Sequence, residues 1–117
     1  YRQASTLSHG QQQRMAFARA TVTQPNVLVL DEPTASMDPR SKREVEGLMQ
    51  NFADQDSGLT LIFASHNLGQ VKRLATHVAY LEYGNMLAYL PVAEFFDEDR
   101  LQTVSEHAHK FLKGDLF

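Results

Sequence analysis

The sequence predicts an α/β fold in which helices flank a mainly parallel sheet and a terminal β-hairpin follows. Two short apolar runs, residues 27–30 and 59–65, each precede a segment with helical periodicity. This alternation is typical of a parallel sheet, because parallel strands need a crossover connection between them. Further along, Gly84-Asn85 separates two more β-prone runs and indicates a two-residue hairpin turn. No repeat or long linker interrupts the pattern, so we expect one unit.

The first predicted helix covers residues 7–22 and begins with a capping-box pattern. Ser8 is followed three positions later by Gln11, so the two side chains can bond each other's backbone N–H groups. Residues 24–26, Gln-Pro-Asn, then end the helix. Residues 27–30 show no polar alternation, which predicts a strand buried on both faces.

A second helix is predicted over residues 39–54, because Asp38 can cap it and Pro39 suits its first turn. Its apolar residues recur at helical spacing and should face the core: Val45, Leu48, Met49 and Phe52. Residues 56–58 end this helix, and residues 59–65 supply the second apolar strand.

The following region predicts a short helix, the two hairpin strands and a helical tail. Apolar residues mark the short helix at Leu68, Val71, Leu74 and Ala75. The strands span residues 78–83 and 86–90. Pro91 then opens the tail, whose apolar residues form one stripe: Leu101, Val104, Ala108, Phe111 and Leu112.

The composition is that of an ordinary globular chain. Of its 117 residues, 43% are hydrophobic and 21% are charged, and the formal net charge is -3. The apolar runs are far shorter than the roughly 20 residues that a membrane-spanning helix needs. The sequence has no cysteine, which excludes disulfides and thiolate chemistry. Mild acidity and scattered basic residues argue against a nucleic-acid partner.

Polar side chains directly follow both strands of the predicted parallel sheet, where open α/β sheets bind ligands. Asp31 and Glu32 follow the first strand, so one carboxylate could hold a divalent cation while the other orients a nucleophile. His66 follows the second strand and could donate a hydrogen bond to a phosphate. Taken singly, each feature is more often a structural turn or helix cap.

The start of the first helix offers a surface for anions, because free backbone N–H groups and the positive end of the helix dipole lie there. Ser8 adds a hydroxyl, and Gly10 allows an anion to approach the backbone closely. If this segment stood alone, a capping box with an incidental glycine would explain it better.

Together, four ordered segments resemble the second half of an ABC-type ATPase domain. They correspond to the signature motif (7–14), the Walker B strand (27–34), the D-loop (36–38) and the switch histidine (His66). The resemblance runs from about residue 5 to residue 90. It implies part of a P-loop NTPase fold, with ATP and Mg²⁺ as cofactors.

The resemblance also implies roles for the strand-end residues. Asp31 would hold Mg²⁺ through water, and Glu32 would be the general base that positions the attacking water. His66 would contact the γ-phosphate, and Asp38 would join contacts across a dimer. These roles suit phosphoryl transfer, in which catalysis is mostly positioning and charge stabilisation.

The signature segment is implied to face a nucleotide that a second subunit holds, through Ser8, Gly10 and Gln11. This segment departs from the family's usual Leu-Ser-Gly-Gly-Gln, because His9 stands where the first glycine would be. We expect His9 to be the first helical residue, where histidine is tolerated. His9 is therefore kept among the candidate nucleotide-contacting residues.

A Walker A loop is absent from this sequence, in which no glycine is followed by another glycine five positions later. The family's Q-loop glutamine and adenine-stacking aromatic would precede Tyr1. We therefore expect residues 1–117 to be the carboxyl-terminal portion of one ABC-type ATPase domain, unable to bind ATP alone. Exposed sheet edge and apolar core surface would then favour dimerisation or strand exchange.

The complete protein is expected to be the ATPase subunit of an ABC membrane transporter. Residues 12–20 and the hairpin look like those of bacterial importers, and residues 111–116 suggest an oxyanion or polar amino acid as substrate. A second nucleotide-binding subunit, as a homodimer, and permease subunits on separate chains would be its partners. It would lie in the cytoplasm, peripheral to the inner face of the cell membrane. Two alternatives stay open: an ABC-type ATPase of translation or DNA repair, and a non-catalytic interaction fragment that supplies only the signature.

Overall fold

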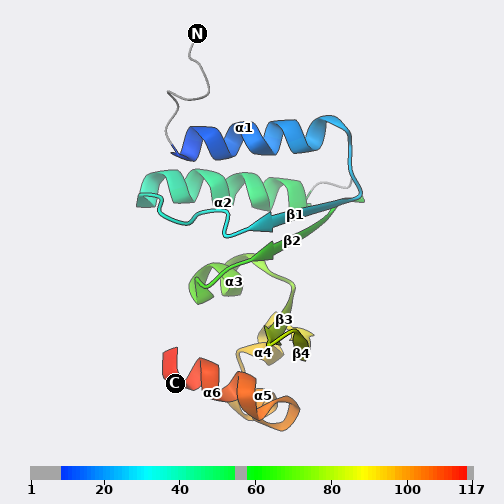
Figure 1. Ribbon diagram of the computed structural model, residues 1–117, viewed down its shortest axis with the longest axis vertical. Helices are drawn as coiled ribbons and strands as arrows, with labels where there is room; N and C mark the ends of the chain where they lie inside the picture. Colours follow the sequence, from blue (N-terminus) through cyan, green and yellow to red (C-terminus); the bar gives the residue numbers. More distant parts are fainter. Residues whose placement is uncertain (1–8, 55–57, 116–117) are drawn as a thin grey trace. The chain divides into compact units, whose positions relative to one another are not determined.

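The computed structural model describes residues 9–54 and 58–115 and has the mixed α/β architecture that the sequence predicts (Figure 1). The chain divides into two compact units, the first ending at His66 and the second beginning at Asn67. Each unit is described by itself below. No glycine- or proline-rich linker marks the division in the sequence, and the assignment of the whole chain to one domain stays a prediction.

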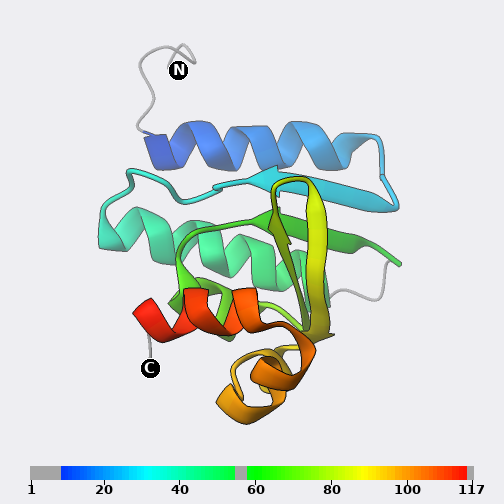
Figure 2. The same cartoon turned by 60° about the horizontal axis from the view of Figure 1, so that its bottom comes forward.

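The first unit is a strand–helix–strand arrangement preceded by a helix. Its elements are α1 (His9–Val22), β1 (Val27–Asp31), α2 (Pro39–Asp54) and β2 (Thr60–Ala64). The two strands are parallel, with Val27 opposite Thr60 and Asp31 opposite Ala64. The chain passes from β1 through α2 to β2 (Figures 1 and 2). The predicted parallel pair and its helical crossover are therefore confirmed.

The core of this unit lies where α2 packs against α1 and β2. Val45 and Met49 of α2 are fully buried, as their helical spacing predicts. Phe17 of α1 is also buried, and its ring stacks on that of Phe52, with the ring centroids 5.6 Å apart. These contacts hold the two helices side by side.

The prediction that β1 is buried on both faces is wrong. Leu28 is buried, but Val29 is 68% exposed, and Ile62, its partner on β2, is 51% exposed. The reason is that the described part of this unit covers only the face on which Leu28 lies. The other face leaves apolar surface exposed, and self-association through that surface stays a prediction.

The second unit contains an antiparallel hairpin and four short helices among its described residues. Its elements are α3 (Leu68–Leu74), β3 (His77–Glu82), β4 (Asn85–Pro91), α4 (Val92–Phe95), α5 (Glu98–Val104) and α6 (Glu106–Asp115). Helix α6 packs against α5 and β4, and α4 packs against both strands. The core therefore lies between the hairpin and the helices that follow it.

The hairpin turn lies one residue earlier than predicted. Glu82 pairs with Asn85, so Tyr83 and Gly84 form the two-residue turn, and Asn85 is the first residue of β4. Both turn residues have positive φ, +52° and +78°. This is the pattern of a type I′ turn, whose second position suits glycine, and glycine at that position fixes the register.

The helical tail consists of three helices because polar side chains start two of them anew. The Asp97 carboxylate accepts a hydrogen bond from the backbone N–H of Arg100, and the Ser105 hydroxyl accepts one from that of Ala108. Three residues of the predicted stripe are fully buried: Leu101, Ala108 and Leu112. The other two, Val104 and Phe111, are partly exposed. The prediction of a single buried apolar stripe is therefore correct for three of its five residues.

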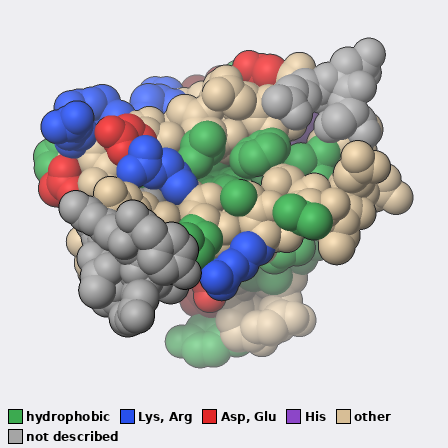
Figure 3. Space-filling model, turned by 90° about the horizontal axis from the view of Figure 1, so that it is seen from above, with side chains coloured by type: hydrophobic (Ala, Val, Ile, Leu, Met, Phe, Trp, Pro, Cys, Tyr) green, Lys and Arg blue, Asp and Glu red, His purple; other side chains and the backbone are tan. Residues whose placement is uncertain are grey.

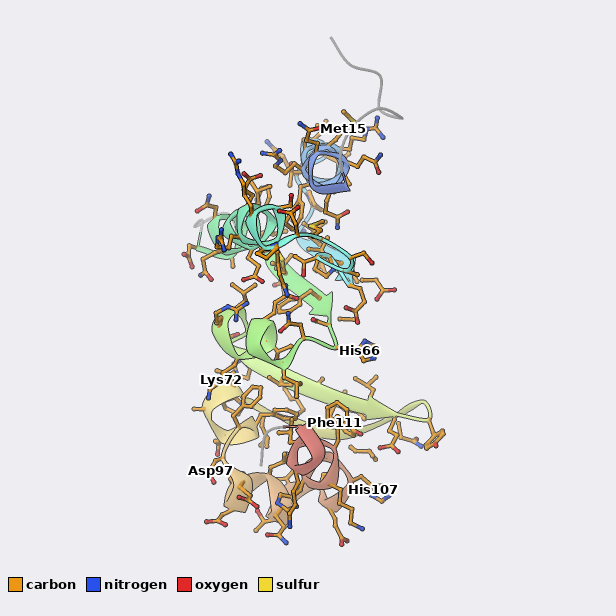
Figure 4. The ribbon with its side chains drawn as sticks, turned by 90° about the vertical axis from the view of Figure 1, so that its left-hand side faces the viewer. Met15, His66, Lys72, Asp97, His107 and Phe111 are labelled. Atoms are coloured by element: carbon orange, nitrogen blue, oxygen red, sulfur yellow. The ribbon has the colours of Figure 1, made fainter. Side chains whose placement is uncertain are left out.

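Aromatic contacts complete the core of the second unit. The ring of Tyr80 on β3 lies 5.3 Å, between centroids, from that of Phe111 on α6. Lys72 of α3 lies over the ring of Phe96 (Figure 4). The Tyr80 hydroxyl donates a hydrogen bond to Glu82, with 2.8 Å between the oxygens. Burial, and next the hydrogen bond to Glu82, raise the pKa of Tyr80 to about 12.

Candidate functional site

The carboxyl ends of β1 and β2 lie together, because the two strands are parallel neighbours. Asp31 ends β1 opposite Ala64 at the end of β2. The backbone N–H of Glu32 donates a hydrogen bond to the carbonyl oxygen of Ala64, at 2.8 Å. This bond carries the strand pairing one residue further and holds the backbone of Glu32 at the edge of the sheet.

Glu32 and His66, the two predicted catalytic residues, are in direct contact. The backbone N–H of His66 donates to Glu32 Oε1 at 3.0 Å, and the imidazole Nδ1 contacts the same oxygen. The His66 side chain is 92% exposed, and that of Glu32 is 34% exposed. Figure 4 shows His66 beyond the end of β2, directed away from the ribbon. Because Nδ1 faces Glu32, Nε2 is the ring nitrogen that a ligand can approach.

The backbone around Glu32 is strained. Glu32 has φ +46° and Ser36 has φ +63°, in the left-handed region that non-glycine residues rarely adopt. Two backbone hydrogen bonds fold the segment into tight turns, from Ala35 N–H to the Glu32 carbonyl and from Met37 N–H to that of Thr34. The sequence carries no glycine at either strained position, so this conformation could not be predicted from it.

Asp31 lies exposed at the end of β1. Among the described residues, no group of three or more metal-ligating side chains comes together. A single exposed carboxylate fits Mg²⁺ nonetheless, because Mg²⁺ keeps several waters and usually takes one or two carboxylates plus substrate phosphates. The donor at this position is therefore suitable, and the metal-binding role of Asp31 stays a prediction.

Asp38 caps α2, as predicted. Its Oδ2 accepts hydrogen bonds from the backbone N–H groups of Arg40 and Ser41, at 3.1 and 3.2 Å. Hydrogen bonds from Ser41, first from its side chain and then from its backbone, lower the pKa of the Asp38 carboxyl. The contact across a dimer that the resemblance implies for Asp38 stays a prediction.

The signature segment leads into α1. Ser8 lies outside the described residues, so its capping role and its nucleotide contact stay predictions. His9 is helical, as expected, and its place as the first residue of the helix stays a prediction because residue 8 lies outside the described residues. Gly10 and Gln11 follow in the same first turn. All three continue as candidate nucleotide-contacting residues.

An ionic link between α1 and α2 was not predicted from the sequence. Arg14 Nη1 lies 3.3 Å from Glu44 Oε2, and Arg40 Nε lies 3.6 Å from Glu44 Oε1. The second pair has i,i+4 spacing within one helix, so the sequence contained a signal for it. The first pair joins two helices and depends on how they pack, for which sequence spacing gives no signal.

Figure 3 shows most of the Lys and Arg side chains of this face toward its left side and hydrophobic side chains exposed across its middle. None of the helices in the described ranges is long and apolar enough to cross a membrane.

A family model described as ABC transporter matches residues 1–35. The phosphate import ATP-binding protein PstB of Thermotoga maritima is 34% identical over 101 residues, covering 86% of this chain and 39% of that protein. The nickel import ATP-binding protein NikO of Rhodobacter capsulatus is 44% identical over 89 residues, covering 75% of this chain and 35% of that protein. The histidine/lysine/arginine/ornithine transport ATP-binding protein HisP of Escherichia coli is 36% identical, covering 94% of this chain and 40% of that protein.

Solved structures show the same fold. An inward-facing putative metal-chelate type ABC transporter matches with TM-score 0.75 and 27% identity, covering 88% of this chain and 40% of that chain. A dimeric ATP-binding cassette in a post-hydrolysis state, bound to ADP and Pi, matches with TM-score 0.64 and 27% identity, covering 75% of this chain and 37% of that chain. The fold is therefore that of a P-loop NTPase, and the chain spans about two fifths of the length of these proteins.

Proposed function

Because this chain belongs to the family of ABC transporter ATP-binding proteins, we propose that it is the carboxyl-terminal portion of the ATP-hydrolysing subunit of an ABC importer. The relatives support the importer type, since the phosphate and nickel proteins are both named as import ATP-binding proteins. The activity is proposed for the complete subunit, of which residues 1–117 are one portion.

The contact between Glu32 and His66 is the observation that carries the proposal. One oxygen of Glu32, Oε1, faces both the backbone N–H and the ring of His66. The other oxygen, Oε2, is therefore the one that would accept a hydrogen bond from the attacking water. His66 would present Nε2 to the γ-phosphate on the same edge of the sheet. This arrangement positions both the water and the phosphate, which is the main task of a protein in phosphoryl transfer.

Mg²⁺ and ATP are the cofactors proposed for this site. Asp31 would hold Mg²⁺ through water, and the metal ion would neutralise charge on the phosphate oxygens. The start of α1 would face the nucleotide of a second subunit through Ser8, His9, Gly10 and Gln11. Backbone N–H groups at the beginning of a helix suit that task, because they are not bonded within the helix.

The proposed partners are a second nucleotide-binding subunit and permease subunits on separate chains. The solved cassette that resembles this chain is described as dimeric, which supports the first partner. The subunit would lie on the cytoplasmic face of the membrane, held there by the permease. The proposed substrate is an oxyanion or a polar amino acid. The named cargoes of the phosphate relative and of the histidine/lysine/arginine/ornithine relative support these classes.

The proposal is tested by mixing the chain with an amino-terminal half-domain that carries a Walker A loop, so that a complete ATP site can form around Glu32, and measuring phosphate release from MgATP. Turnover should require both components and should be lost in Glu32→Gln. Turnover that survives Glu32→Gln but is lost in Ser8→Ala would assign a non-catalytic, signature-presenting role instead.

A calorimetric titration of the chain alone with MgATP tests the proposed inability to bind ATP. We expect no measurable binding, because the sequence lacks the glycine-rich loop that supplies most phosphate donors in this fold. Tight binding would contradict the proposal.

A further inference from the structure

Two kinds of contact join α1 to α2, and they differ in what they can fix. Phe17 stacks on Phe52, and buried Val45 and Met49 lie in the same core. Apolar contacts of this kind are strong but not directional, so they hold the helices together without fixing how one slides or turns against the other. A directional contact between the two helices is the ionic link from Arg14 to Glu44.

The Glu44 carboxylate uses its two oxygens for two different helices. Oε2 lies 3.3 Å from Arg14 Nη1 on α1, and Oε1 lies 3.6 Å from Arg40 Nε on α2. Arg40 also donates its backbone N–H to Asp38, the cap of α2. A continuous series of contacts therefore runs from the Asp38 turn to the second turn of α1.

Both ends of this series adjoin segments with proposed roles in ATP hydrolysis: the signature segment would face nucleotide, and the segment from Glu32 to Asp38 would position water and contact the second subunit. Arg14 lies three residues after Gln11, at the end of the signature segment. At the other end, Asp38 caps α2 directly after the turns that follow Glu32. A change in the position of α1 relative to α2 would therefore move one of these segments against the other.

We infer that Glu44 is a positioning residue, whose carboxylate fixes the start of α1 against the start of α2 and so keeps the signature segment and the Asp38 turn in one mutual arrangement. The inference rests on the proposed function for its consequence in turnover, but the link itself can be measured without it. Glu44 does not touch nucleotide and acts through Arg14 and Arg40.

The stability of the fold should depend little on this link. The side chains of Arg14 and Glu44 are 44% and 40% exposed, and exposed ion pairs contribute little to unfolding free energy. If Glu44 had only a structural role, Glu44→Gln would lower amide protection slightly and by the same amount throughout the first unit. A positioning role predicts an effect concentrated at the start of α1.

The first experiment is amide hydrogen exchange on the full 117-residue chain. Glu44→Gln should lower the protection of backbone amides in residues 13–18 about two- to fivefold, the range expected for one exposed ion pair. The matched control is Glu106→Gln, which breaks the exposed pair with Lys110 within α6. The control should leave residues 13–18 unchanged. Equal protection in both variants, or equal loss throughout the first unit, would overturn the inference.

Companion variants identify the partner of Glu44. Arg14→Gln should reproduce the loss, Arg14→Lys should retain most of the protection, and the double variant Arg14→Gln/Glu44→Gln should lose no more than either single variant. Additive losses would mean that the two residues act separately and would overturn the link.

The second experiment measures turnover of MgATP in the mixture with the Walker A-bearing half-domain, whose dimer places the signature segment of one copy against the nucleotide of the other. Glu44→Gln should lower kcat severalfold at unchanged KM, because ATP is gripped by the other subunit while the signature segment is misplaced. An unchanged kcat together with the exchange effect would overturn the positioning role. If Glu32→Gln retains full turnover, the proposed function fails, whereas the exchange experiment still decides whether Glu44 fixes the two helices.

Discussion

One oxygen of Glu32 meets both the backbone and the ring of His66, although 34 positions separate the two residues in the chain. The parallel pairing of β1 and β2 accounts for this meeting, because each residue lies just beyond the end of its strand. The backbone contact does not depend on the side chain at position 66. The ring can therefore be removed while Glu32 keeps one of its two donors.

His66→Ala is expected to lower kcat about 10²-fold at unchanged KM, the usual effect of losing a group that acts only in the transition state. The measurement is phosphate release by the mixture with the Walker A-bearing half-domain, in which ATP lies at the site that contains His66. The control is His77→Ala, since His77 is an exposed histidine of β3 that stacks on Tyr89. A kcat equal to that of the unaltered chain would contradict the role of the ring.

Asp38→Asn is expected to lower the stability of the chain at pH values above the pKa of the Asp38 carboxyl. It should also make the stability depend less on pH in the acid range. The folded pKa of Asp38 lies below its ordinary value of 3.8, so its charge stabilises the fold fully above that value. This stabilisation is lost as the pH falls through the folded pKa. Thermal unfolding from neutral to acid pH measures the effect, with Asp54→Asn at the other end of α2 as control. Identical acid profiles for the unaltered chain and Asp38→Asn would contradict the prediction.

Tyr80→Phe is expected to change the alkaline limb of the stability curve. The pKa of Tyr80 is raised to about 12 in the folded chain, against an ordinary value of 10.0. Its contribution is therefore complete below pH 10 and is lost as the pH rises through about 12. At neutral pH the free energy of unfolding of the variant should be about 1 kcal/mol lower than that of the unaltered chain, because the hydrogen bond to Glu82 is lost. As the pH rises toward 12, this difference should become smaller. Denaturant unfolding measures both effects. Tyr83→Phe, at a side chain that is 94% exposed, should show neither.

Two glycine-to-alanine changes are expected to have opposite effects. Gly84→Ala should lower the free energy of unfolding by about 1–2 kcal/mol, because φ is +78° and alanine disfavours this conformation. A Cβ at this position would meet no atom within 4 Å, so the backbone conformation alone accounts for the cost. Gly47→Ala, inside α2 and equally open, should gain about 0.5–1 kcal/mol from helix propensity. Denaturant unfolding of both variants gives the comparison. Equal signs would contradict the type I′ turn at residues 83–84.

The sequence predicted elements wherever a local cause decides them. Asp38 and Pro39 start α2 at the expected residue, and the apolar run at 27–30 is a parallel strand. The burial of both faces of β1 was mispredicted. A run of apolar residues without polar alternation shows that both faces of a strand could be buried, but it does not show that another element packs on each face. The single apolar stripe predicted for the helical tail holds only in part, because capping by Asp97 and Ser105 divides the tail into separate helices.

The candidate site was predictable in composition and only partly in geometry. Glu32 and His66 come together because both follow parallel strands, which is a consequence of topology that the sequence signals. The positive φ of Glu32 and the link from Arg14 to Glu44 arise from tertiary packing. Neither has a fixed spacing or a diagnostic residue type, so sequence patterns could not predict them.

At position 32 the backbone conformation and the proposed activity favour different residues. Glycine at position 32 would relieve a conformational cost of about 1 kcal/mol or more. Glycine, however, has no carboxylate with which to orient water. Glycine would also remove the acceptor of the His66 backbone N–H, so the left-handed conformation is retained at position 32 for the carboxylate that it aims at the edge of the sheet.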